Sequence, residues 1–279
     1  MKKTIKISPV KNTVIIYDNI IYKNHIGDFL RDNITLKMSL VLPFDNTPVF
    51  QKKPLLIWLE GGAWRNSSPC ARNGELAWFA YRDIAVANVE YSVDSNNAWP
   101  ACLEDVKEAI RFLRHNADIY GIDKDRIIIA GESAGAHLAS LTGLTIGDPD
   151  YPGKDFPEES DAVNGVISFY GTGDTDVEVN DYIRYYDLLI RGNISENEEL
   201  KKRINPMSYA DKKTVPFLFF HGGSDTLVPI AATEHLYEKL LANGNEADFY
   251  VVEGARHADL MFSQEPIREM MLDFIKKHI

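Results

Sequence analysis

Residues 127–137 read Ile-Ile-Ile-Ala-Gly-Glu-Ser-Ala-Gly-Ala-His, and the rest of the chain is organised around them. The apolar, mostly β-branched start predicts a strand buried on both faces, and leucines at helical spacing follow the stretch. Only a sharp turn fits between strand and helix, so Gly131 and Gly135 suit positions where a Cβ would be crowded. A G-x-S-x-G in this context is typical of a nucleophile elbow, which holds the Ser133 hydroxyl above the sheet edge.

The composition limits the class of protein and its partners. The 279 residues are 45% hydrophobic and 25% charged, which is enough to bury a large core and predicts one α/β domain over residues 1–279. The formal net charge of -11 argues against nucleic acid or membrane partners, because both require a basic face to neutralise phosphates. We therefore expect a small-molecule partner, and a monomer or a homodimer.

From the sequence we expect neither a targeting segment nor a metal site. The start Met1-Lys2-Lys3 is followed by an apolar stretch too short for a signal peptide, and no run approaches the roughly 18 apolar residues of a membrane span. Cys70 and Cys102 are too few for a disulfide framework, and no Cys/His cluster has zinc spacing. These features predict a cytoplasmic protein with free thiols and no metal.

Strands and helices alternate along the chain. Residues 13–42 alternate apolar and polar side chains in short steps, which predicts antiparallel edge strands. Besides the strand before Ser133, buried parallel strands are predicted at residues 54–59, 84–91, 163–170, 215–220 and 249–252. Helices are predicted at residues 72–81, from 100, after 133, at 229–243 and from 263. This order predicts an α/β fold with a mostly parallel sheet and helices on both faces.

One segment interrupts the alternation. Residues 171–214 form an insertion between two predicted strands. It carries apolar and aromatic residues at helical spacing, namely Tyr182, Tyr185, Tyr186, Leu189 and Ile190. We predict that the insertion is a small cap. Because the chain shows no internal repeat or low-complexity linker, a second domain is not expected.

Two residues downstream of Ser133 could activate it. A serine hydroxyl needs a base and an acid that orients this base, and Asp225 and His257 each follow a predicted strand. Loops that leave parallel strands at their carboxyl ends meet at one edge of the sheet, and the order Ser, Asp, His is the one used by this kind of fold. Ser133, Asp225 and His257 are therefore candidate catalytic residues, with Asp174 and Asp176 as alternative acids.

With these motifs the chain resembles the α/β-hydrolase superfamily. It is most similar to the small carboxylesterases related to the hormone-sensitive-lipase group and to the bifunctional carbohydrate and feruloyl esterases, the BD-FAE-like group. The matching stretches are residues 60–64, 99–105, 131–137 and 225–229, together with His257. The resemblance implies that Ser133, Asp225 and His257 form a triad and that the backbone N–H groups of Gly62, Ala63 and Ala134 form an oxyanion hole. It implies no metal or organic cofactor.

Two positions depart from the family pattern. Glu60 stands where the family loop usually has a histidine, and Ala63 replaces its third glycine. Neither change removes a backbone donor. A carboxylate directed at a developing oxyanion would repel it, so we predict that Glu60 turns away and pairs with Arg65 or Arg72.

The resemblance implies a serine carboxylesterase that hydrolyses small esters, among which acetyl or feruloyl esters of carbohydrates are candidates. Trp64, Glu132 and Tyr170 are candidate pocket residues, although core packing is the alternative for the aromatic residues and a structural role beside the elbow for Glu132. A peptidase of the same fold is an alternative function, although such peptidases usually carry a large extra domain. A non-catalytic ligand-binding protein is another, suggested by Glu60.

Overall fold

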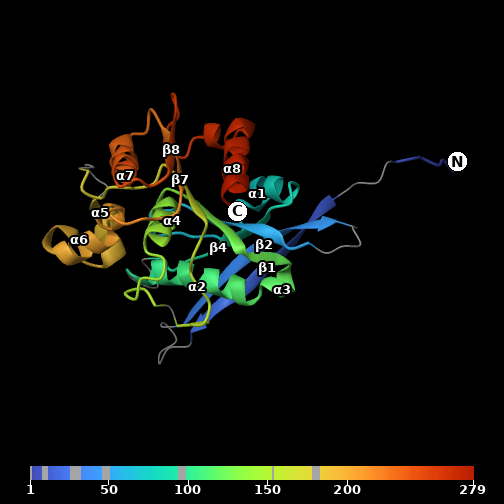
Figure 1. Ribbon diagram of the computed structural model, residues 1–279, viewed down its shortest axis with the longest axis horizontal. Helices are drawn as coiled ribbons and strands as arrows, with labels where there is room; N and C mark the ends of the chain where they lie inside the picture. The colour runs from blue at the N-terminus through green and yellow to red at the C-terminus, as the bar shows by residue number, and fades with distance from the viewer. Residues whose placement is uncertain are drawn as a thin grey trace.

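The computed structural model describes residues 2–7, 12–25, 33–45, 51–93, 99–152, 154–177 and 183–279. It contains one eight-stranded sheet with the strand order β1-β2-β4-β3-β5-β6-β7-β8 (Figure 1). The strands are β1 (Asn12–His25), β2 (Ile34–Asp45), β3 (Lys53–Leu59), β4 (Ala85–Val89), β5 (Ile122–Glu132), β6 (Gly165–Phe169), β7 (Phe217–Gly222) and β8 (Ala247–Val252).

The pairing of the strands confirms the predicted α/β class. At one edge β1 pairs antiparallel with β2, and β2 pairs antiparallel with β4. All the other pairs, from β4–β3 to β7–β8, are parallel. The carboxyl ends of β3, β5, β6, β7 and β8 therefore meet at one edge of the sheet, where ligands bind in parallel α/β folds.

Helices follow most of the strands. They are α1 (Asn73–Ala80), α2 (Ala101–His115), α3 (Ala117–Tyr120), α4 (Ala134–Leu144), α5 (Ile183–Ile190), α6 (Glu198–Ile204), α7 (Ile230–Ala242) and α8 (Glu265–His278). The last helix begins two residues later than predicted, because a short 3₁₀ turn, η4 (Leu260–Ser263), precedes it and is capped by the Asp259 side chain. Among the helices in the described ranges, none is both long and apolar enough to cross a bilayer.

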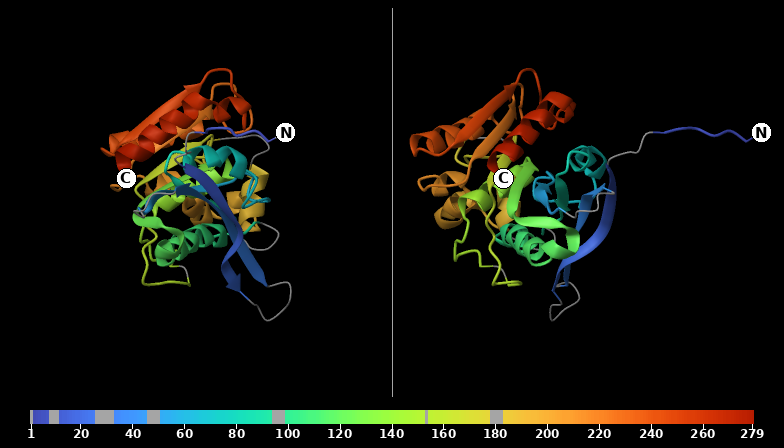
Figure 2. Two further views of the ribbon diagram at one scale, coloured as in Figure 1. Left: turned by 90° about the vertical axis from the view of Figure 1, so that its right-hand side faces the viewer. Right: turned by 45° about the vertical axis from the view of Figure 1, so that its right-hand side comes forward.

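Each face of the sheet buries its own core. Leu55 and Ile57 belong to the core that includes residues of α2, α4 and α7, whereas Leu56 and Trp58 belong to the core that includes residues of α1 and α8. This alternation follows from the period of two along a strand. Figure 2 shows α8 and α2 on opposite sides of the sheet. Burial of each large apolar side chain contributes about 1.5–3 kcal/mol, so both cores hold the central strands in place.

The insertion between β6 and β7 is helical in its described part. It contains α5, η2 (Ile194–Glu196), α6 and η3 (Pro206–Tyr209), and these elements lie beside α7 (Figure 1). Tyr186 and Leu189 of α5 are buried in the core, as their helical spacing predicted, whereas Tyr182 lies outside the described residues. The role of this insertion as a cap, and the extent of the single domain over residues 1–279, stay predictions.

Candidate active site

Ser133 lies in the sharp turn between β5 and α4. Its backbone has φ 51° and ψ -117°, a strained conformation for a residue with a side chain. A Cβ at Gly131 would lie under 3.0 Å from the backbone of Gly135, and a Cβ at Gly135 under 3.0 Å from the backbone of Leu59. The prediction that both positions require glycine is confirmed. The turn thus exposes the Ser133 hydroxyl at the carboxyl edge of the sheet.

The imidazole of His257 lies between the other two candidate residues. Its Nδ1 is 2.8 Å from Oδ2 of Asp225, and its Nε2 is 2.9 Å from Oγ of Ser133. An ionised carboxylate only accepts hydrogen bonds, so Nδ1 donates to Asp225 and the neutral ring accepts the Ser133 hydroxyl at Nε2. The structure therefore brings together three residues that are far apart in the sequence, in a geometry that can transfer the serine proton to the imidazole.

Asp225 is held by several donors. Its Oδ1 accepts the backbone N–H groups of Leu227 and Val228, at 2.9 and 3.0 Å. Burial raises the pKa of Asp225, but hydrogen bonds from His221 and His257 outweigh it and hold this pKa well below its ordinary value. The carboxylate is therefore ionised across the range in which His257 can act as a base.

His221 is a site residue that the sequence reasoning did not identify. It is fully buried, and its Nε2 lies 3.2 Å from Oδ2 of Asp225 and 3.0 Å from the carbonyl of Val228. Both neighbours are acceptors, so Nε2 carries a proton. The position of His221 at the end of a strand, four residues before Asp225, was the signal available in the sequence.

The alternative acids have other partners. Asp174 accepts hydrogen bonds from His235 at 2.8 Å and from Asn205 at 3.2 Å. Asp176 pairs with Lys201 at 2.9 Å. The structure thus brings Asp225, and neither of these two acids, within hydrogen-bond distance of His257.

The loop after β3 lies against the elbow. A Cβ at Gly61 would approach the Cβ of Ser133 to 3.1 Å. Gly62 has φ 146° and Ala63 has φ 51°, and a Cβ at Gly62 would lie under 3.0 Å from the carbonyl oxygen of Asn66. This irregular backbone carries the predicted oxyanion-hole donors Gly62 and Ala63, and it directly follows Gly61, which approaches the serine.

The structure corrects one of the predicted partners of Glu60. Its Oε2 accepts the backbone N–H of Ser68 at 2.7 Å, which links the start of the loop after β3 to a residue eight positions further along it. Arg72 binds Glu132 and Glu75 instead, because α1 directs its guanidinium to the elbow. Burial raises the pKa of Glu60, while the Ser68 hydrogen bond opposes this rise.

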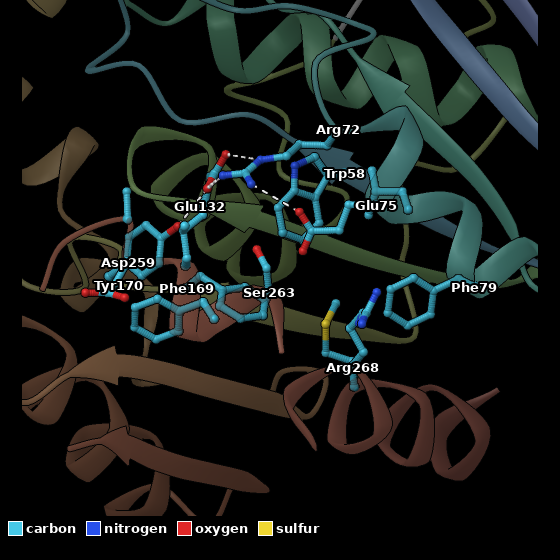
Figure 3. Close-up of a pocket in the computed structure, with 15 residues that line it drawn as sticks. Trp58, Arg72, Glu75, Phe79, Glu132, Phe169, Tyr170, Asp259, Ser263 and Arg268 are labelled. Atoms are coloured by element: carbon cyan, nitrogen blue, oxygen red, sulfur yellow. Dashed lines mark hydrogen bonds and ion pairs between the residues drawn. The ribbon is translucent and has the colours of Figure 1, made fainter. Parts of the chain in front are cut away.

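A pocket of about 90 Å³ lies beside the elbow, between α1, η4 and α8 (Figure 3). Glu132 and Tyr170 are among the residues that line it, but Ser133, Asp225 and His257 are not, so the part of Glu132 and Tyr170 in substrate binding stays a prediction. Apolar side chains from distant elements, such as Trp58, Phe79 and Phe262, complete its walls. The sequence reasoning missed these three, because each has the pattern of an ordinary core residue.

Trp64 has a different environment from that of the other predicted pocket residues. It is 1% exposed, and its ring centroid lies 5.1 Å from that of His137 and 5.6 Å from that of Tyr186. Trp64 thereby joins the elbow helix to the insertion. Its role in substrate binding stays a prediction.

Potential metal ligands are dispersed. In the part of the chain that the structure describes, no group of three His, Cys, Asp or Glu side chains is arranged to hold a metal ion. His221, His235 and His257 each lie against a carboxylate instead.

Comparisons with known proteins agree with this architecture. A family model described as BD-FAE matches residues 43–240. Esterase LipC of Mycobacterium tuberculosis is 32% identical over 212 residues, which are 73% of this chain and 52% of that protein. Esterase LipQ of the same organism is 34% identical over 221 residues, 75% of this chain and 51% of that protein. The chain thus spans about half the length of the curated relatives it matches.

A solved structure extends the likeness to nearly the whole chain. A truncated form of a carbohydrate esterase from gut microbiota superimposes with a TM-score of 0.81 and 26% sequence identity. The match covers 95% of this chain and 96% of that one.

Proposed function

The chain belongs to the BD-FAE family and has the α/β-hydrolase fold, and from this premise we propose that it is a serine carboxylesterase with Ser133, His257 and Asp225 as its catalytic triad. One observation carries the proposal. His257 lies within hydrogen-bond distance of both the hydroxyl of Ser133 and the carboxylate of Asp225. The esterase names of the relatives support the same activity.

The proposed reaction has two halves. His257 takes the hydroxyl proton as Ser133 Oγ attacks the ester carbonyl, and the N–H groups of Gly62, Ala63 and Ala134 donate to the oxyanion that forms. The alcohol leaves with the proton from His257, and an acyl group stays on the serine. Water, deprotonated by the same imidazole, then attacks the acyl group and releases the carboxylic acid.

We propose acetyl or feruloyl esters of carbohydrates as the substrate class. The BD-FAE family model and the fold shared with a protein named as a carbohydrate esterase support this choice. Hydrolysis rates for p-nitrophenyl esters from acetyl to octanoyl, acetylated xylo-oligosaccharides and methyl ferulate test it. Preference for the last two over the simple esters is the expected result. Turnover of peptide amides in place of esters would favour the peptidase alternative.

A cytoplasmic location is part of the proposal. Its support is that Cys70 is exposed and Cys102 buried, both as free thiols, which persist in a reducing compartment. We further propose a monomer or a homodimer.

The variant Ser133→Ala tests the catalytic assignment. Removal of the nucleophile is expected to lower kcat by about 10³-fold or more with an unchanged melting temperature. Covalent labelling by a fluorophosphonate is expected for the wild-type protein and not for the variant. Retained turnover in the variant would contradict the assignment.

A further inference from the structure

An ion pair lies directly behind the nucleophile. Arg72, just before α1, donates from Nε to Oε1 of Glu132 at 3.1 Å and from Nη2 to Oε2 at 2.5 Å, as Figure 3 shows. The third nitrogen, Nη1, pairs with Glu75 at 3.1 Å. Glu132 is 5% exposed and precedes Ser133 in the chain. A two-bond contact of this kind fixes the carboxylate in one orientation.

Tyr170 links the Glu132 carboxylate to the imidazole of His257. Tyr170 donates its hydroxyl to Oε2 of Glu132 at 2.6 Å, and its ring centroid lies 4.8 Å from that of His257 at an angle of 64°. Tyr170 is 3% exposed, and its ring also packs against that of Phe262 with the centroids 4.7 Å apart, so these neighbours restrict the ring. Contacts therefore run from Arg72 through Glu132 and Tyr170 to the imidazole.

The charges in this chain of contacts bear on the proton transfer. A carboxylate close to His257 favours the protonated imidazole, which cannot accept the proton of Ser133. The guanidinium of Arg72 offsets the charge of Glu132. Loss of the Arg72 charge alone therefore makes the electrostatic potential at His257 more negative, and loss of the Glu132 charge alone makes it more positive.

We propose that Arg72 is a positioning residue for the reaction: through Glu132 it fixes Tyr170 against the imidazole of His257 and balances the carboxylate beside Ser133. The inference rests on the proposed esterase function. Arg72 touches none of the three triad side chains and acts only through its neighbours.

Other charged groups surround His257 as well. Asp225 contacts His257 directly, and His221, at the end of β7, lies behind Asp225. Asp259 follows His257 by two residues. Glu75 of α1 and Arg268 of α8 line the adjoining pocket. Asp259 caps η4, and Glu75 pairs with Arg72. Each of these groups is retained when Arg72 or Glu132 is replaced, so a change in pH dependence reports on the replaced pair.

The test measures kcat/KM against pH for the full chain with p-nitrophenyl acetate. For Arg72→Gln we expect the midpoint of the acid limb to rise by about half a pH unit or more, and for Glu132→Gln to fall by a similar amount. The double variant is expected to return to within about 0.2 pH units of the wild type. Arg72→Lys keeps the charge but not the two-bond geometry, so it should keep the midpoint and lower kcat by about tenfold.

Arg82→Gln is the matched control. Arg82 is also a partly exposed arginine next to α1, but it lies over the ring of Trp78 and near Glu269, so its loss is expected to leave the midpoint unchanged. If Arg72→Gln does not fold, Glu132→Gln and Arg72→Lys decide the question. Midpoints of Arg72→Gln and Glu132→Gln that stay at the wild-type value, or that shift in the same direction, overturn this inference alone. A wild-type protein without esterase turnover or fluorophosphonate labelling overturns the proposed function as well.

Discussion

At the scale of single residues, the Glu60 carboxylate could either bind the backbone of its own loop or repel the oxyanion that forms in the proposed reaction. Its carboxylate accepts the N–H of Ser68, and Tyr91 donates its hydroxyl to the Glu60 carbonyl at 2.7 Å. Both contacts hold the loop that carries Gly62 and Ala63. Glu60 therefore contributes an acceptor oxygen that stabilises the loop of the proposed oxyanion hole.

Substitution of Glu60 tests this role. Glu60→Gln retains an acceptor for Ser68, so kcat is expected to change by less than about threefold. Glu60→Ala removes it and should lower kcat by about tenfold, the equivalent of one hydrogen bond of about 1.4 kcal/mol. Steady-state kinetics on both variants make the comparison. A strong rise of kcat in Glu60→Gln would show that the carboxylate opposes the oxyanion.

At the scale of elements, the elbow depends on the close approach of α4 to β3. Gly135, in the first turn of α4, has no space for a Cβ because the Leu59 and Glu60 carbonyls of the neighbouring strand end occupy it. We expect Gly135→Ala to destabilise the protein by about 3 kcal/mol, since a clash with backbone atoms cannot be relieved by a side-chain rotation. Urea unfolding at pH 7 measures the change.

Gly74 in α1 provides the control for that variant. A Cβ there would meet no atom within 4 Å, and alanine is the better helix former. Gly74→Ala should therefore leave the free energy of unfolding unchanged or raise it by up to about 1 kcal/mol. Equal effects of the two alanine variants would contradict the steric account of the elbow.

At the scale of the whole molecule, His137 connects the sheet-bound elbow helix to the insertion. Its Nε2 donates to the carbonyl of Ile204 in α6 at 2.7 Å. Complete burial lowers the pKa of His137 from 6.5 to about 4, an effect that the Ile204 hydrogen bond opposes. The folded protein thus keeps this ring neutral at a pH where the unfolded chain protonates it.

The stability of the fold should therefore depend on pH. Below about pH 6.5 the unfolded state takes up a proton at His137 that the folded state does not, so stability falls as the pH drops toward 4. Between pH 7 and pH 5 this residue should account for a loss of about 2 kcal/mol. The test is urea unfolding of the wild type and of His137→Gln at pH 7 and at pH 5. The glutamine keeps an amide donor for the Ile204 carbonyl but does not titrate, so between these pH values the variant should lose about 2 kcal/mol less stability than the wild type. An equal loss in both proteins would contradict the prediction.

The elements and their order along the chain could be predicted from the residues alone. Residues 127–144 predict a strand, a tight turn and a helix, because apolar periodicity and the lack of a Cβ at glycine act within a few residues. Ser133, Asp225 and His257 could be predicted as catalytic candidates because each follows a predicted strand and parallel strands end at one edge of the sheet.

The pairing of side chains, by contrast, could be seen only in the folded protein. Arg72 and Glu132 are 60 residues apart, and their contact depends on how α1 packs against the sheet. The same holds for His221 behind Asp225, and for the backbone N–H of Ser68 as the partner of Glu60. Hydrogen bonds and ion pairs depend on distance in space, and their partners are set only when the helices and loops have packed around the strands.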